Sequence, residues 1–430
     1  DHSFHKSVMV LVLLDTLDDN ATGGKTQTAG EKMKSIRING SRFLGMLVAG
    51  VLALSACATS PSGAEDLFSQ RNANALDPAT IDAVGDKVME WQIANLDDLS
   101  YIRNIRASTE DRRGWVHGAM YVGMMNWAAL PGNEEFFAPL RTISEEEEWR
   151  LGERLFHGDD HIVGQLYLTF YEQEEDPQMI DHTIRQLNQI LVADPDVSLE
   201  FLGDGIRGVG RACQLRWCWC DALFMSPQTW IKLSLVTGDD QYMAYADKEF
   251  WATTDYLLDP EFNLYYRDSR YFTMREEAGN KIFWSRGNGW VYAGLVNILR
   301  ILPQDHPSYP RYVQLYKDMS ATIAGLQHDH GFWSPSLLDK NPNPVPETSG
   351  SGFMTYGLAW GLNNGHLDEA TYGPVVRKGW KALVSAVGDD GKLGWVQPIG
   401  SAPDSVFETD SQLYGVGAFL LAASQMYEAK

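Results

Sequence analysis

The sequence has few basic residues for its length. Its 430 residues include 35 Lys and Arg against 57 Asp and Glu, which gives a formal net charge of -22 at pH 7. Proteins that bind nucleic acids need positive charge to neutralise phosphates. The composition therefore excludes nucleic acid as a partner. It also means that an anionic ligand must be held by local donors against long-range repulsion.

Cysteine is also scarce, because four residues are too few for a disulfide scaffold. Cys213, Cys218 and Cys220 lie too close together to link distant elements, although a local bridge is possible. A zinc site would need a second CxxC or a matching HxxxH, and the spacing supplies neither. We interpret these residues as buried thiols beside an aromatic cluster.

Several motifs of common enzyme classes are missing, among them HExxH, GxSxG and the P-loop. The segment Gly203–Gly208 fits GxGxxG, but no βαβ pattern follows it, and the next predicted helix opens with CWCDALF. We therefore exclude a dinucleotide site.

No apolar run is long enough to span a bilayer. The longest near the N-terminus, Phe43–Ala56, follows three basic residues and fits the apolar core of a signal peptide. It ends in LSAC, which resembles a bacterial lipobox with Cys57 as the residue to be lipidated. Residues 33–57 are thus predicted to be a lipoprotein signal peptide that begins at a plausible start Met, and residues 1–32 an upstream extension that is not native structure.

The chain after Cys57 is rich in Ser and Gly, and we expect residues 58–78 to form a flexible tether. Residues 79–430 are expected to form a single catalytic domain. A lipidated Cys57 would anchor an exported protein on the periplasmic side of a membrane, with the outer membrane as the expected one. The sequence sets no oligomeric state.

Twelve helices are predicted from about residue 80 onward, and they alternate in character. The polar, amphipathic set comprises Thr80–Asp97, Glu134–Arg154, Met179–Val192, Asp240–Leu257, Tyr309–His328 and Ala370–Val387. The aromatic, glycine-rich set comprises Val116–Leu130, His161–Tyr171, Trp219–Val236, Gly287–Leu302, Gly350–Leu362 and Gln412–Tyr427. The second set shows no solvated face, so the first set would cover it from outside. Six such outer/inner hairpins predict an all-α fold, an (α/α)6 barrel.

Reactive and aromatic residues gather where the inner helices begin. They are Trp115; Asp159, Asp160 and His161; Trp217, Trp219 and Asp221; and Trp284, Arg286 and Trp290. If the inner helices run parallel, their N-termini share one rim of the barrel, and these residues converge there. Ordinary N-caps would account for some of the polar residues, but not for the tryptophans or the arginine.

Asp221 is the candidate acid. It directly follows Trp217 and Trp219, and a carboxyl group walled by indoles loses solvation, which should raise its pKa and keep it protonated. The indoles also suit stacking against a sugar ring. The alternative is an Asp that only caps a core helix.

Asp159, Asp160 and His161 form the second acidic element, which could bind a metal, a sugar hydroxyl or a water. Two carboxylates flank the bond in a glycosidase, so Asp160 with Asp221 is a legitimate pair. A capping role is as plausible for Asp159. Arg286 offers bidentate recognition of a carboxylate, or an ion pair to a neighbouring helix.

The chain resembles the unsaturated rhamnogalacturonyl hydrolases of glycoside hydrolase family 105 and their relatives, the unsaturated glucuronyl hydrolases. The matching stretches, from about Trp115 to the C-terminus, are GDDHIVGQLYL, WCWCDALFMSP, YYRDSRYF, FWSRGNGW, ETSGSGFMTYGLAWGLNNG and QLYGVGAFLLAAS. The resemblance implies an (α/α)6 barrel, no metal or other cofactor, and an oligosaccharide substrate that ends in the 4,5-unsaturated uronic acid left by pectin-type lyases.

The resemblance also implies the chemistry, which is hydration of a vinyl ether. Asp221 would protonate C4, water would add at C5, and collapse of the hemiketal would release the next sugar. Asp160 or Asp159 would assist, Arg286 would bind the uronate, and the sugar subsite would be lined by Trp217, Trp219 and Trp290. His161, Trp284 and Trp115 are further candidates for substrate binding. Cys218 interrupts the run of tryptophans usual in the family.

Two other functions stay open. A conventional (α/α)6 glycosidase would use the same two carboxylates, whereas a non-catalytic lipoprotein that binds oligosaccharides would need the tryptophans but not Asp221. A sugar epimerase is disfavoured, because such enzymes work with pairs of histidines and only His161 lies at the predicted rim.

Overall fold

The computed structural model describes residues 74–203, 211–341 and 344–429. The predicted signal peptide, Cys57 and all but the last residues of the predicted tether lie outside the described residues. The described residues belong to one compact unit.

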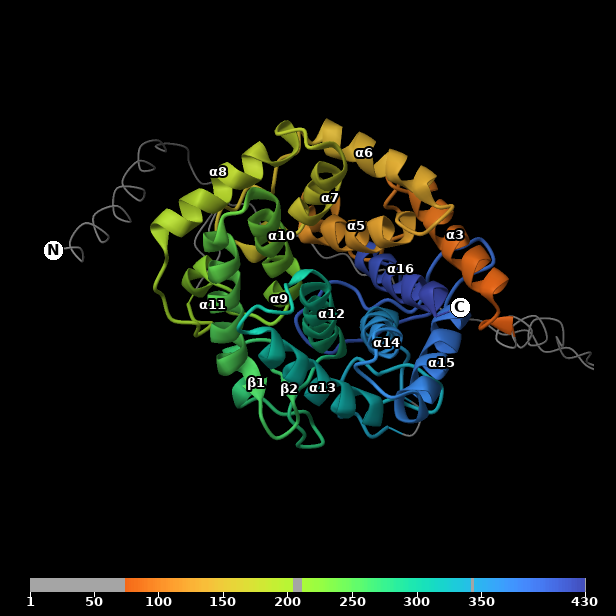
Figure 1. The fold of residues 1–430 in the computed structure, drawn as a ribbon. Helices are drawn as coiled ribbons and strands as arrows, with labels where there is room; N and C mark the ends of the chain where they lie inside the picture. The colour runs from red at the N-terminus through yellow and green to blue at the C-terminus, as the bar shows by residue number, and fades with distance from the viewer. Residues whose placement is uncertain (1–73, 204–210, 342–343, 430) are drawn as a thin grey trace, which may run out of the picture. The chain divides into compact units, whose positions relative to one another are not determined.

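Six inner helices form the centre of this unit (Figure 1). They are α5 (Trp115–Ala128), α7 (Gly164–Glu174), α10 (Pro227–Thr237), α12 (Ser285–Ile301), α14 (Thr348–Asn363) and α16 (Leu413–Glu428). Every residue from Thr348 to Gly361 of α14 is buried, as expected of a helix whose apolar and small residues leave no polar stripe.

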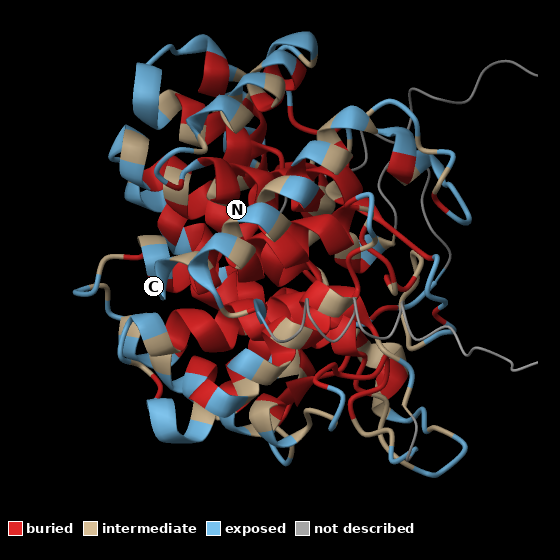
Figure 2. Ribbon diagram, turned by 90° about the vertical axis from the view of Figure 1, so that its right-hand side faces the viewer, coloured by how far each residue is buried: buried red, intermediate tan, exposed pale blue. Residues whose placement is uncertain are grey.

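Six outer helices surround them (Figure 1). They are α3 (Pro78–Ala94), α6 (Phe137–Glu146), α8 (Gln178–Ala193), α11 (Asp240–Leu257), α13 (Tyr309–Gly325) and α15 (Glu369–Ser385). In α8 the buried residues, such as Ile180, Leu187 and Ile190, recur every three or four positions, which is the spacing of one helical face. Figure 2 shows the result as a buried interior under a partly exposed outer layer.

The inner helices close into a ring. Each contacts the next in chain order, and the last, α16, packs against the first, α5. Glycines permit this closure: a Cβ on Gly123 would overlap the carbonyl oxygen of Gly417, and one on Gly417 would overlap that of Ala119. The all-α (α/α)6 barrel predicted from the sequence is confirmed.

Two predicted helices differ from the observed ones. The expected helix Trp219–Val236 is split into α9 (Ala222–Met225) and α10, because Pro227 cannot donate the hydrogen bond that would join them. The expected helix Glu134–Arg154 is a 3-10 turn, η1 (Glu134–Phe136), followed by α6, which stops before Glu148 and Trp149, both with positive φ.

The remaining elements are short. They are α4 (Ala107–Glu110), the 3-10 turns η2 (Gly158–His161), η3 (Ala212–Leu215) and η4 (Ser269–Phe272), and the antiparallel pair β1 (Leu258–Asp259) and β2 (Leu264–Tyr265). None of the helices within the described ranges has both the length and the apolar character to cross a bilayer.

Candidate active site

A cavity of about 750 Å³ lies at the end of the barrel where α5 and α9 begin. Its lining residues are Arg106, Ala107, Ser108, Asp111, Gly114, Trp115, Arg154, Asp159, Trp219, Asp221, Met225, Arg267, Ile399, Gly400 and Ser401. Four residues predicted for the site therefore meet here: Trp115, Asp159, Trp219 and Asp221.

Asp159 is positioned by the 3-10 turn η2. Its backbone N–H donates to His157 Nδ1 (3.4 Å), and its Oδ2 lies 3.8 Å from Arg154 NH2. Burial raises the pKa of Asp159 to about 7; Arg154 opposes that rise, and Asp160 and Asp221 add to it. Asp159 is therefore a carboxyl group that carries a proton through much of the range up to neutral pH.

Asp160 is 3% exposed and does not line the cavity. Its carboxylate accepts hydrogen bonds from the backbone N–H (2.7 Å) and Nε (3.1 Å) of Arg154. The sequence had favoured Asp160 over Asp159 as the second functional carboxylate. In the structure Asp159 lines the cavity and Asp160 does not, although Arg154 NH2 lies near both carboxylates, and Asp160 positions Arg154.

Asp221 stands at the start of α9 and is held from two sides. The backbone N–H of the preceding Cys220 donates to the carbonyl of Arg267 (2.9 Å), which joins this loop to the segment after β2. Arg267 Nε then lies 3.4 Å from Asp221 Oδ2. The expected wall of two indoles is only half present, and a guanidinium faces the carboxylate as well.

Arg267 is itself fixed by a buried acid. Its NH1 donates to Asp268 Oδ2 (2.8 Å), and Asp268 also accepts from Arg270. Asp221 and Asp268 raise the pKa of Arg267 against the effect of its burial, so it stays charged. The guanidinium lies over the ring of Phe201, 5.4 Å from the centroid, and Arg270 lies over the same ring. Arg267 lies in the YYRDSRYF stretch of the resemblance but is not among the candidate site residues predicted from the sequence.

The tryptophans separate into two groups. Trp115 and Trp219 line the cavity, with Trp115 stacked on Tyr414 (centroids 5.3 Å apart) and Trp219 against His157 (4.7 Å). Trp217 is 1% exposed and packs on Tyr245 in the core, outside the cavity lining.

Trp290 and Trp284 are also buried outside the cavity lining. Trp290 is fully buried between Phe224 and Phe353, and Trp284 donates to Gln397 Oε1 (2.9 Å). The prediction that Trp217 and Trp290 wall the cavity does not fit these positions.

Arg286 is likewise withdrawn from the cavity. Its side chain is fully buried, donates to the backbone carbonyls of Gln397 (2.8 Å) and Pro398 (3.0 Å), and lies over the rings of Trp284 and Tyr414. The predicted uronate-binding arginine instead fixes the loop before α16. The loop residues after Pro398 line the cavity, so Arg286 supports the site from behind.

His161 is a buried structural residue. Its Nδ1 is 2.7 Å from Ser226 Oγ and its Nε2 is 3.0 Å from the carbonyl of Leu155, and burial lowers its pKa. It lies outside the cavity lining, so the role in substrate binding predicted for it finds no support in the geometry. No group of three or more His, Cys, Asp or Glu side chains in the described part of the chain is arranged to hold a metal ion.

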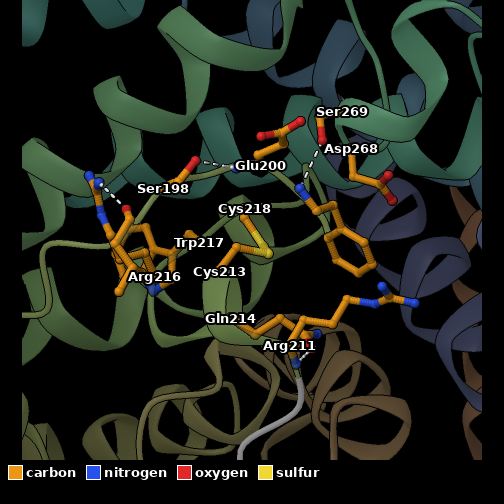
Figure 3. The surroundings of a disulfide bond; sticks show 12 residues. Ser198, Glu200, Arg211, Cys213, Gln214, Arg216, Trp217, Cys218, Asp268 and Ser269 are labelled. Atoms are coloured by element: carbon orange, nitrogen blue, oxygen red, sulfur yellow. Dashed lines mark hydrogen bonds between the residues drawn. A yellow bond between two sulfur atoms is a disulfide. The ribbon is translucent and has the colours of Figure 1, made fainter. Parts of the chain in front are cut away.

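Cys213 and Cys218 form a disulfide (Figure 3). The interpretation of these residues as thiols is therefore wrong, and the local bridge is the correct alternative; Cys220 remains a buried free thiol. The bridge closes the loop immediately before Trp219, and it lies between Trp217, in the core, and the segment that carries Arg211 (Figure 3).

Arg106, Ser108, Asp111, Arg154 and Ser401 are cavity residues that the sequence analysis did not single out. They lie in loops and in a four-residue helix, where no periodic pattern marks them. For Arg154 a signal existed: it stands six residues before Asp160, within reach of an acidic turn.

The cavity combines three carboxyl groups, one of them with a raised pKa, three arginines and two indoles. Arg154 and Arg267 have carboxylate partners, whereas Arg106 has no ion pair within the described ranges. Such a set can bind a sugar that carries negative charge and can transfer a proton to it.

Comparison with known proteins gives consistent matches. The model of Glycosyl Hydrolase Family 88 matches residues 84–430. An unsaturated 3S-rhamnoglycuronyl hydrolase from Alteromonas sp. (strain LOR) is 42% identical over 355 residues, 81% of this chain and 86% of that protein. A protein of the same name from Formosa agariphila is 34% identical over 368 residues, 84% of this chain and 93% of that protein. A solved structure described as a polysaccharide lyase superposes with a TM-score of 0.70 at 29% identity, over 82% of this chain and 98% of its own.

Proposed function

Because the chain belongs to glycosyl hydrolase family 88, we propose that it removes a 4,5-unsaturated uronic acid from the non-reducing end of oligosaccharides made by polysaccharide lyases. The next sugar would be a rhamnose, as the names of the two relatives suggest. The observation that carries the proposal is the cavity that holds Asp159, Asp221 and Arg267 beside the indoles of Trp115 and Trp219.

The arginines supply the recognition of the uronate. A guanidinium binds a carboxylate through two parallel hydrogen bonds, and a partly desolvated site strengthens them. Arg267 presents its Nε toward Asp221, and Arg106 carries a charge without an ion-pair partner in the described part of the chain. These two cations offset the repulsion that a chain of net charge -22 exerts on an acidic sugar.

The carboxyl groups supply the proton. Asp221, which lies in the WCDALFM stretch of the resemblance, would protonate C4 of the vinyl ether. Water would then add to C5 and return a proton to the carboxylate pair, and the hemiketal would collapse and release the next sugar. Burial raises the pKa of Asp159 to about 7, so a proton is available in the same cavity near neutral pH.

One assay tests the proposal. An unsaturated disaccharide with rhamnose as its second sugar is incubated with the protein, and the near-UV absorbance of the conjugated double bond is followed. Hydration bleaches this absorbance, whereas binding alone or cleavage by a conventional glycosidase leaves it intact. Asp221→Asn should abolish the bleaching while the control Asp305→Asn, at an exposed position, keeps it. A fully active Asp221→Asn protein would refute the mechanism.

A second candidate is a lyase reaction, favoured only by the solved structure described as a polysaccharide lyase. The same absorbance separates the two, because β-elimination creates the conjugated double bond. A rise in absorbance on an intact polysaccharide would support a lyase, and a fall on the unsaturated disaccharide supports the hydrolase.

We also propose that the protein is exported and anchored by a lipid on Cys57, facing the periplasm, in line with the LSAC stretch and its basic and apolar flanks. Metabolic labelling with palmitate should mark the native protein in its bacterial host and should fail for Cys57→Ser. Labelling that persists in Cys57→Ser would refute this assignment.

A further inference from the structure

A second cavity, of about 220 Å³, opens on the barrel away from the first. It is lined from four inner helices, by Asn126 of α5, Thr169 of α7, Gln228 and Lys232 of α10, and Asn297 and Arg300 of α12. On α5, Trp115 of the first cavity and Asn126 of this one are eleven residues apart, which corresponds to about 16 Å along the helix. The two cavities are therefore separate chambers.

Positive charge is in excess in the lining of this second cavity, which we call the distal chamber. Lys232 Nζ donates to Thr169 Oγ1 (2.9 Å) and pairs with Glu172 Oε2 (3.0 Å). Arg300 NH1 donates to Asn126 Oδ1 (2.6 Å) and to the Tyr356 hydroxyl (3.2 Å). Arg300 has no carboxylate within ion-pair distance in the ranges that the structure describes, and Glu428 acts on its charge only from beyond that distance.

Two buried polar atoms in the lining lack partners. Asn297 is 8% exposed, and its Nδ2 donates to no described group, although its Oδ1 accepts from the Tyr356 hydroxyl (2.6 Å). Gln228 is 1% exposed: its Nε2 donates to the carbonyls of Leu223 and Gly294, but its Oε1 accepts nothing from the described residues. An unsatisfied buried polar group destabilises the folded protein, and a ligand that satisfied both groups would remove that cost.

Helix-end electrostatics explain only part of this arrangement. Arg300 lies in the last turn of α12, where a cation is favoured by the helix dipole. That effect requires neither a donor at Asn297 nor an acceptor at Gln228, and it does not require a cavity between them. A cation, a free donor and a free acceptor that converge on one cavity are instead what a small charged ligand with hydroxyl groups needs.

We propose that the distal chamber is a binding site for a small hydroxylated anion of the chemical class of an acidic monosaccharide. The carboxylate of the ligand accepts from Arg300 and from Asn297 Nδ2, and a ligand hydroxyl donates to Gln228 Oε1. The site does not depend on the proposed function, because none of its residues lines the first cavity.

Isothermal titration of the full chain with D-galacturonate tests the proposal, with D-galactose as the neutral match. We expect Arg300→Met and the isosteric Asn297→Asp to lose one class of galacturonate sites, with at least a tenfold weaker affinity there. Arg267→Met, at the other cavity, should keep that class. Galacturonate should also raise the melting temperature of Arg267→Met but not that of the double variant Arg267→Met/Arg300→Met, which checks both binding and folding.

Three results would overturn the site: an isotherm that Arg300→Met and Asn297→Asp leave unchanged, galactose bound as tightly as galacturonate, or a wild-type protein that binds no galacturonate outside the first cavity.

Discussion

Asp159→Asn is expected to stabilise the folded protein above neutral pH, although it removes a group proposed to serve catalysis. In the folded protein, burial raises the pKa of Asp159 from its ordinary 3.8 to about 7. A group with a raised folded pKa contributes stability that is fully present below its unfolded pKa and is lost as the pH rises through its folded pKa. The window for this loss therefore runs from about pH 4 to above pH 7.

The size of the effect follows from the two pKa values. The two pKa values differ by about 3, and a difference of one in pKa corresponds to about 1.36 kcal/mol. The wild-type protein therefore loses about 4 kcal/mol of its free energy of unfolding across the window. The amide that Asp159→Asn introduces does not titrate, so this loss is absent from the variant. The free energy of unfolding of the variant minus that of the wild type should thus rise by about 4 kcal/mol between the two ends of the window.

Denaturant unfolding of both proteins at several pH values measures this difference, and the contributions of groups that do not interact with Asp159 cancel in it. Asp305→Asn, at an exposed position, is the matched control and should show no such trend. A difference between Asp159→Asn and wild type that stays constant from acid to mildly alkaline pH would refute the claim that burial holds the proton on Asp159.

Three further predictions follow from other parts of the structure. The double variant Cys213→Ser/Cys218→Ser should lower the free energy of unfolding by about 2 kcal/mol, because the unfolded chain regains the entropy of the short loop that the disulfide closes; urea unfolding measures this. The same variant should reduce kcat, because Trp219 and Asp221 directly follow the bridge, and the absorbance assay measures that effect. Gly123→Ala should destabilise the protein by about 3 kcal/mol or more, since its Cβ would meet backbone of α16 that cannot move aside, and a calorimetric scan should show it. Arg267→Lys should raise KM far more than it lowers kcat, because an ammonium cannot reproduce the two-point contact with a carboxylate, and steady-state kinetics separate these effects.

Much of the fold was predictable because burial leaves a periodic trace in a sequence. α11 was predicted with its observed bounds, Asp240–Leu257, and most other helices to within a few residues. The break between α9 and α10 was also readable, since Pro227 stands inside the expected helix. The polar tail of the expected helix Glu134–Arg154 gave no such warning, and there the backbone adopts positive φ at Glu148.

The site was predictable in its residue types but not in its directions. Asp159 and Asp160 are neighbours, and no sequence pattern says which of them turns toward the cavity. Arg286 opens an inner helix as expected, yet it points at the carbonyls of Gln397 and Pro398, which are more than a hundred residues away in the chain. Pairings at that separation leave no local signal.

The pairing of Cys213 with Cys218 could not be predicted from the sequence for a different reason. Cys213 and Cys218 have Cα atoms 5.6 Å apart, a separation suited to a bridge, but that distance depends on how η3 turns the chain between them. Three closely spaced cysteines allow three pairings, and the choice between them is made by the loop conformation.

Because α16 packs against α5, the barrel can close only after the last helix has been synthesised. Since the last helix of the barrel supplies the wall next to the first, a growing chain exposes the apolar flank of α5 until the final helix has left the ribosome. A nascent chain stalled before residue 413 would lack α16 and would leave the apolar surface of α5 exposed. It should therefore bind chaperones that the complete barrel does not bind.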